Sequence, residues 1–245
     1  MAFLGKLFAG NTLYYPGCLT KTVAKDLLEN YKKILTKIGI DYIMLNDLEV
    51  CCGSPVLNAG FKEDARKLAE KNLAVFHDHG IKKIITACPA CYKTFSQDYP
   101  KLLRKWDIEV EHITITIARA IKEGKLKPRE IKKSMTYHDP CHLGRHSGIY
   151  EEPRQIILAT GAKLKEMELN KELAFCCGAG GGVMANHPEL ANSIAKERIE
   201  MAEKSGADEL VTCCPMCYIN LKNNSKKMKV LEFSQLLEGE DEEPK

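Results

Sequence analysis

The chain has 245 residues, of which 44% are hydrophobic and 28% charged, and its 36 Lys and Arg against 33 Asp and Glu give a net charge of +3. This length allows one large domain or two of roughly 120 residues, either of which buries a core without disulfide bonds. The small net charge argues against nucleic acid as a partner, and no stretch nears the ~20 apolar residues of a transmembrane segment.

The first half of the chain predicts strands that alternate with helices. Apolar residues at helical spacing form faces that begin at Val23 and at Phe61, and Gly39 and Gly80 end these two helices. In chain order, the expected elements are a strand at 12–15, a helix at 23–38, a strand at 42–45, a helix at 61–76 and a strand at 84–86.

The second half repeats this order. Its expected elements are a strand at 135–138, a helix at 152–160, a strand at 163–167, a helix at 189–204 and a strand at 209–212. Alternation of this kind predicts an α/β fold of two tandem, duplicated Rossmann-like halves with parallel sheets, related by pseudo-two-fold symmetry. The expected domains are 1–124 and 131–237, followed by an acidic tail at 238–245.

Eleven cysteines are present. No export signal is recognised, so a cytoplasmic location is expected, either free or peripheral to the membrane through a partner. A reducing compartment opposes disulfides, so metal binding or thiol redox chemistry is the better interpretation.

Ten of these cysteines form two matching sets. The offset between equivalent positions stays between 123 and 126 residues, which indicates an internal duplication. The sets are Cys18, Cys51, Cys52, Cys88 and Cys91, then Cys141, Cys176, Cys177, Cys214 and Cys217, and Cys213 is left over. Cys18, the Cys51-Cys52 pair and Cys88 each follow a predicted strand. Because the carboxyl ends of parallel strands lie on one edge of the sheet, we expect the five cysteines of each set to converge there.

Three chemistries compete for these thiols. Zinc takes four ligands, so five cysteines leave one over in each half, although zinc in one half stays open. Dithiol exchange fits the C-x-x-C at Cys88 and Cys91, but not the Cys51-Cys52 pair. An iron–sulfur cluster has several irons, so two adjacent cysteines can bind different ones, and this is the preferred interpretation. Four glycines beside the cysteine pairs are expected to bring backbone close to the clusters: Gly53, Gly178, Gly180 and Gly181.

The segments YHDPCHLGR at 137–145 and FCCGAGGG at 175–182, with the Cys51-Cys52-Gly53 motif, carry a family resemblance. The chain resembles the CCG cysteine-rich domains found in the B-type subunit of heterodisulfide reductase and in the iron–sulfur subunits of flavin-dependent lactate or glycolate dehydrogenases. This resemblance implies a noncubane [4Fe–4S] cluster on each set of five cysteines, two in all. It also implies cleavage of a small-molecule disulfide, such as that of coenzymes M and B, between the clusters, with thiols as the products.

The resemblance implies partners as well. No C-x₂-C-x₂-C-x₃-C ferredoxin motif occurs here, so electrons are expected from a ferredoxin-like iron–sulfur subunit or an FAD-containing subunit. Two alternatives stay open: the electron-transfer subunit of a flavin-dependent 2-hydroxy acid dehydrogenase, and a redox-inert module, stabilised by zinc or clusters, that binds a partner.

Histidines lie beside the cysteines. His138 and His142 flank Cys141, and His187 follows the glycine run. Since the pKa of histidine lies near neutrality, each is a candidate proton donor when a disulfide is reduced. The alternative for each is a histidine that simply bonds the backbone.

Overall fold

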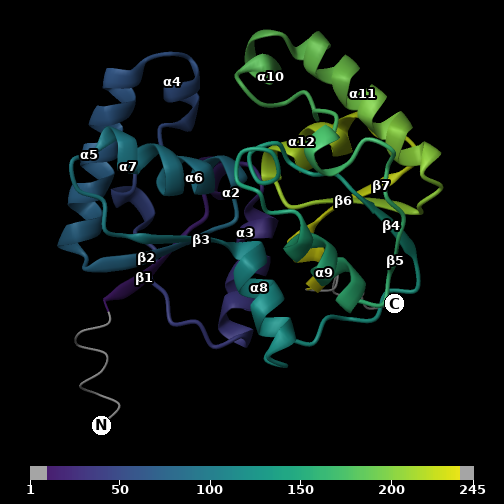
Figure 1. Ribbon diagram of the computed structural model, residues 1–245, viewed down its shortest axis with the longest axis horizontal. Coiled ribbons are helices and arrows are strands. Elements are labelled where there is room, and N and C mark those ends of the chain that lie inside the picture. Colours follow the sequence, from purple (N-terminus) through teal and green to yellow (C-terminus); the bar gives the residue numbers. More distant parts are fainter. Residues whose placement is uncertain (1–9, 238–245) are drawn as a thin grey trace.

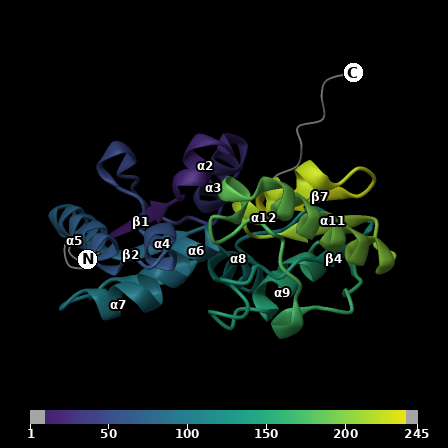
Figure 2. The ribbon, with the colours of Figure 1, turned by 90° about the horizontal axis from the view of Figure 1, so that it is seen from above.

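The computed structural model describes residues 10–237, and these form two α/β halves that lie side by side (Figure 1). The same arrangement is seen from above in Figure 2. The acidic tail predicted at 238–245 lies outside the described residues.

Each half has a parallel sheet, as the alternation of strands and helices predicts. The first sheet contains β1 (Asn11–Tyr15), β2 (Ile81–Thr86) and β3 (Glu109–His112) in the order β1-β2-β3. The second contains β4 (Ser134–Tyr137), β5 (Lys163–Leu164), β6 (Glu209–Thr212) and β7 (Lys229–Glu232) in the order β5-β4-β6-β7. The orders match when β1, β2 and β3 are paired with β4, β6 and β7, so the duplication extends to the topology.

Helices connect these strands. The first half has α2 (Cys18–Thr22), α3 (Lys25–Lys37), the short η1 (Asn46–Leu48), α4 (Ser54–Asn58), α5 (Lys62–Asp78), α6 (Pro89–Lys93), the π-helical turn η2 (Thr94–Asp98), α7 (Tyr99–Leu102) and α8 (Ile113–Lys122). The second half has α9 (Glu151–Ala159), η3 (Lys171–Leu173), α10 (Val183–Asn186), α11 (Pro188–Lys204), α12 (Pro215–Asn224) and α13 (Phe233–Leu237).

The structure corrects several predicted elements. The predicted strand at 42–45 is wrong, since only Ile43 pairs with β1, through an isolated parallel bridge to Leu13. The helix predicted at 23–38 starts two residues late, as α3 from Lys25 to Lys37, and Val23 lies before it with 64% of its surface exposed. Phe61 precedes the first turn of α5 and is 62% exposed, so it does not belong to the buried face of that helix. The strand predicted at 163–167 covers only two residues.

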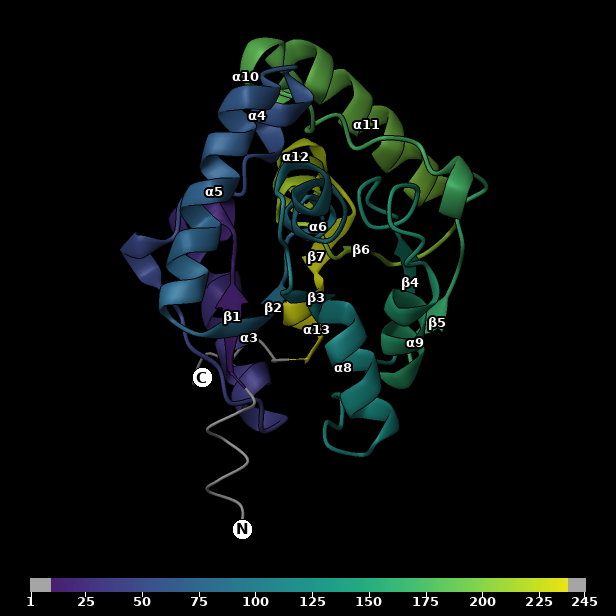
Figure 3. The same cartoon turned by 60° about the vertical axis from the view of Figure 1, so that its left-hand side comes forward.

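One buried cluster joins the two halves. It contains Tyr14 and Ile117 of the first half and Ile157 and Phe233 of the second. Helix α8 contacts α9, and α3 contacts α13. Burial of this apolar surface stabilises the pair of halves as one unit. Figure 3 shows that α4 and α10, which follow the two cysteine pairs, lie at the same end of the molecule.

Candidate metal centres

The five cysteines of the first half are brought together where its strands end. Helix α2 begins at Cys18 directly after β1, and Cys88 precedes α6 directly after β2. Side-chain hydrogen bonds link the thiols in an unbroken chain that runs through Cys18, Cys51, Cys52, Cys91 and Cys88. The predicted convergence therefore occurs.

The second half repeats this arrangement. Hydrogen bonds link Cys176 to Cys177, Cys177 to Cys217, and Cys217 to Cys214. The fifth cysteine, Cys141, lies beside them: burial raises the pKa of its thiol, and the charges of Cys214 and Cys177 raise it further. All ten predicted ligand positions thus lie in two groups of five.

The second cysteine of each adjacent pair is the central acceptor of its group. Hydrogen bonds from Cys51 and Cys91 lower the pKa of Cys52 to about 5. Hydrogen bonds from Cys176 and Cys217 hold the pKa of Cys177 well below its ordinary value, and one from His138 lowers it further. A thiolate is the form that binds metal, and these hydrogen bonds favour the thiolate of the central cysteine in each group.

Glycine backbone lies against both groups. A Cβ on Gly17 would be 3.4 Å from the Sγ of Cys91, and a Cβ on Gly178 would be 2.5 Å from the carbonyl oxygen of Ala191. The Gly178 amide donates to the Sγ of Cys176 at 3.3 Å. Glycine is required where the backbone comes this close with a positive φ, which is +83° at both positions. Gly17 is not among the predicted glycines, although its place directly before Cys18 is a visible signal.

The other predicted glycines are placed differently. Gly53 has a φ of +84° and precedes α4, while Gly181 has a φ of +63°. A Cβ on Gly180 or Gly181 would meet no atom within 4 Å, so neither is held against described backbone.

The three predicted histidines have different environments. His138 is buried and hydrogen-bonds Cys177. His142 is half-buried with its Nδ1 3.5 Å from the Sγ of Cys141, and burial followed by the charges of His146 and Lys93 lowers its pKa. His187 is exposed between α10 and α11, and its ring makes no hydrogen bond or ion pair within residues 10–237.

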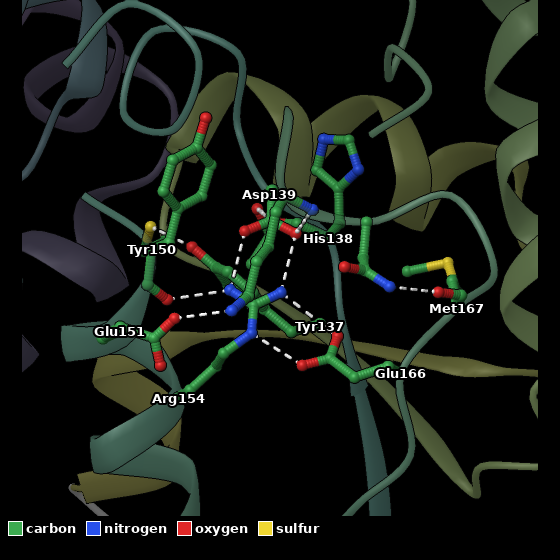
Figure 4. Close-up of polar contacts among 12 residues, drawn as sticks. Tyr137, His138, Asp139, Tyr150, Glu151, Arg154, Glu166 and Met167 are labelled. Carbon is green, nitrogen blue, oxygen red and sulfur yellow. Dashed lines mark hydrogen bonds and ion pairs between the residues drawn. The ribbon is translucent and has the colours of Figure 1, made fainter. Parts of the chain in front are cut away.

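A buried ion pair supports the loop that leads to Cys141 (Figure 4). Arg154 binds Asp139 through two hydrogen bonds of 2.8 and 3.0 Å and also binds Glu166 at 2.6 Å. Asp139 further accepts a hydrogen bond from the Lys171 amide at 2.9 Å. A bidentate pair of this kind fixes geometry. Asp139 lies in the segment that carries the family resemblance, yet sequence patterns predict no role for either partner.

Cys213 is separate from both groups. It is fully buried, in the cluster that joins the halves, and its Sγ lies 3.0 Å from the Tyr137 hydroxyl. An offset of 126 residues relates it to Ala87 of the first half, which is also fully buried, so Cys213 is a small core residue.

Both groups lie near the junction of the halves. Helix α2, which begins at Cys18, contacts α12, which carries Cys217. Ala24 and Leu27 of the first half share a buried cluster with Cys177 and Cys217. On the other side, Gln97 of η2 donates to the carbonyl oxygen of His146 at 2.7 Å, close to Cys141.

The donor set is suited to a metal. The ligand atoms of His138, Cys177 and Cys217 lie within 4.8 Å of one another. The charges of Cys177 and Cys217 favour the protonated form of Arg198. The Nη2 of Arg198 is buried and has no hydrogen-bond partner in the described part of the chain. Five converging sulfurs exceed the four ligands of a zinc ion and match a larger, anionic group of several metal atoms.

Comparisons with known proteins agree with this duplication. The family model of the CCG cysteine-rich domain matches twice, at residues 12–96 and 135–222. A subunit of the dihydromethanophenazine:CoB–CoM heterodisulfide reductase of Methanosarcina mazei is 38% identical over 226 residues, which are 90% of this chain and 55% of that protein. The EtfAB:quinone oxidoreductase of Syntrophomonas wolfei is 34% identical over 236 residues, which are 92% of this chain and 33% of that protein. The chain thus spans about half the length of the first of these relatives and a third of the second.

A solved structure supports the fold. A hypothetical protein from Helicobacter pylori aligns with a TM-score of 0.64 at 13% identity, over 94% of this chain and 48% of that one. None of the helices within residues 10–237 has the length and apolar character needed to cross a membrane.

Proposed function

We propose that this chain, which belongs to the family of CCG cysteine-rich domains, is an iron–sulfur subunit of an oxidoreductase and transfers electrons. The observation that carries the proposal is the convergence of five thiols in each half, with a low-pKa cysteine at the centre of each group. Relatives named as oxidoreductases or their subunits support it.

We assign one noncubane [4Fe–4S] cluster to each half. Its ligands would be the five cysteines of each group, with Gly17 and Gly178 providing close backbone. Such clusters supply one-electron transfer at a protein-enclosed site. The described residues contribute thiolate ligands, amide donors such as the Gly178 N–H, and the positive charge of Arg198. Five ligands in each half leave zinc the weaker assignment.

The substrate we propose is a small-molecule disulfide that is reduced to two thiols. The name of the Methanosarcina relative, at 38% identity, supports this class, as does the position of both thiol groups near the junction of the halves. Of the three histidines, His142 is best placed to deliver a proton to a sulfur, because its Nδ1 faces Cys141. His138 is less suited, because it is buried, its Nδ1 accepts a hydrogen bond from Arg198, and its ring already hydrogen-bonds Cys177, a proposed cluster ligand.

A second candidate function is the relay of electrons between a flavoprotein and an acceptor. The likeness to an EtfAB:quinone oxidoreductase favours it, at 34% identity over most of this chain. Both functions need a partner, and we propose a ferredoxin-like iron–sulfur subunit or an FAD-containing one. Consumption of a disulfide by the reconstituted complex would select the first function, and reduction by a flavoprotein without disulfide cleavage the second.

Anaerobic purification with metal analysis tests the assignment. We expect about eight irons and about eight sulfides per chain, since each cluster has four of both. Cys52→Ser and Cys177→Ser should each lower the iron content by about half, while Cys213→Ser, the matched control in the core, leaves it unchanged. Stoichiometric zinc without iron, or equal loss of iron in all three variants, would refute the assignment.

A further inference from the structure

The two thiol groups differ at two positions that the repeat makes equivalent. An offset of 123 residues relates Cys18 to Cys141, and the same offset makes Tyr15 equivalent to His138. An offset of 126 residues makes Asn72 of α5 equivalent to Arg198 of α11, and both side chains are buried. The pair Tyr15 and Asn72 in the first half is thus replaced by His138 and Arg198 in the second.

In the first half, Tyr15 and Asn72 hydrogen-bond the backbone of Val50 and Cys51. The Tyr15 hydroxyl donates to the carbonyl oxygen of Val50 at 2.8 Å. The Asn72 side chain accepts from the Val50 amide at 3.2 Å and donates to the carbonyl oxygen of Cys51 at 3.2 Å. These contacts shape the loop before Cys52, and none of them reaches a sulfur.

In the second half the equivalent pair acts on a thiol. Arg198 donates through Nε to the Nδ1 of His138 at 3.1 Å and through Nη1 to the carbonyl oxygen of Leu169 at 2.9 Å. A guanidinium has only N–H groups, so Nδ1 of His138 is the acceptor and the ring proton lies on Nε2. The hydrogen bond between His138 and Cys177 is therefore donated by His138 to the sulfur.

Arg198 also places a positive charge beside the second group. Its side chain is fully buried, and its Nη2 has no partner among the described residues. The neighbouring Asp139 is paired with Arg154 at 2.8 Å, although its charge also acts on Arg198. The first half has the neutral Asn72 at the equivalent position.

We infer that His138 and Arg198 make the cluster bound by the second thiol group the more easily reduced of the two, so that the first electron entering the chain resides there. Reduction adds negative charge to a cluster, and a hydrogen bond to a ligating sulfur and a nearby cation both stabilise that charge. His138 acts on the ligand directly, while Arg198 fixes the His138 ring and also adds its positive charge beside the thiols. This inference rests on the proposed function, since it requires a cluster in each half.

A redox titration of the full chain under anaerobic conditions tests this order. Dithionite supplies the electrons one at a time, EPR follows each cluster, and Cys177→Ser identifies the signal that belongs to the second half. In the unmodified chain we expect that signal to appear first. If the first-half signal appears first, or both appear together, the inference is wrong.

Variants then test the residues. His138→Phe removes the donor, and Arg198→Asn introduces the residue of the first half. Each should lower the reduced-to-oxidised ratio of the second cluster at a fixed potential by about tenfold, which is ~59 mV for one electron. Arg198→Lys keeps the charge but not the planar Nε donor, so a smaller shift is expected. Tyr15→Phe, the matched control, should shift neither signal, because its hydroxyl donates to the Val50 carbonyl and bonds no sulfur within residues 10–237.

Failure of the proposed function is distinguishable from failure of this inference. Iron and sulfide analysis precedes the titration, and a chain without clusters would overturn both. A chain with two clusters whose order of reduction is reversed would overturn only the inference. A variant that keeps its iron and its potential would remove that residue from the explanation and thereby contradict the inference.

Discussion

Gly178 directly follows the second cysteine pair, and its backbone lies against helix α11. Its φ of +83° lies in the left-handed region, and a Cβ there would approach the carbonyl oxygen of Ala191 to 2.5 Å and the Cβ of Ile194 to 3.0 Å. Contacts under 3.0 Å to backbone force a shift of the chain, because a carbonyl of a packed helix has little freedom to move. The Gly178 amide also donates a hydrogen bond to the Sγ of Cys176, two residues earlier in the chain.

We therefore expect Gly178→Ala to lower the free energy of unfolding by about 1–3 kcal/mol, because it adds both a clash and an unfavourable φ. Gly180→Ala is the control two residues away, since a Cβ there meets nothing within 4 Å and its φ is not positive. Urea denaturation followed by circular dichroism measures both. Equal stability of the two variants would contradict this account of Gly178.

At the residue scale, the sequence predicts the ligand positions but not what surrounds them. The five, five and one partition of the cysteines follows from spacing alone, and the structure brings each five together. The position of His138 beside Cys141 makes it a visible candidate, but its partner Arg198 is 60 residues away in the chain. A contact of that separation depends on how α11 packs against the sheet, which periodicity does not specify.

At the scale of elements, the last strand of each half is absent from the predicted elements for one physical reason. β3 has Glu109 and Glu111 and β7 has Lys229 and Glu232, so neither has the apolar run of a buried strand. The partners that permit burial come from elsewhere in the fold: Tyr31 of α3 donates a hydrogen bond to Glu232 across the two halves. Sequence patterns detect apolar strands but not charges whose partners are distant.

Glu232 gives stability a dependence on pH. Burial raises its pKa from 4.5 to about 7, although it accepts hydrogen bonds from Tyr31 and from the Ser234 amide. Between these values the folded chain holds a proton that the unfolded chain has lost, so the free energy of unfolding falls as pH rises from 4.5 to 7. Above about pH 7 both the folded and the unfolded chain have lost this proton, so Glu232 causes no further fall in the free energy of unfolding.

Glu232→Gln removes this titration and keeps the side-chain shape. Relative to the unmodified chain, the variant should gain stability progressively from pH 4.5 to 7 and keep a constant advantage above it, on the order of 3 kcal/mol. Urea midpoints measured at several pH values give the difference. Glu200→Gln, on the exposed face of α11, should give a curve parallel to that of the unmodified chain. A difference for Glu232→Gln that does not change with pH would contradict the assignment.

At the scale of the whole molecule, duplication has not produced two independent units. The buried cluster that joins the halves takes residues from both, among them Ile117 of α8 and Ile157 of α9. Cys213, the one cysteine outside the thiol groups, packs in this shared cluster beside β6. The alternation of strands and helices predicts two halves, whereas periodicity marks a helix face as buried without saying which half covers it.

The shared cluster predicts that the halves unfold together, and the chain offers a local probe. Trp106, the only tryptophan, lies in the first half with its ring stacked on Phe95. Ile157→Ala in the second half should lower the free energy of unfolding by about 2–5 kcal/mol, as large-to-small core substitutions do, and should shift the urea midpoint of Trp106 fluorescence as much as that of circular dichroism. Leu158→Ala, at a neighbouring side chain that is 55% exposed, should change either midpoint little. A Trp106 midpoint that stays in place while the circular dichroism midpoint moves would mean that each half unfolds on its own.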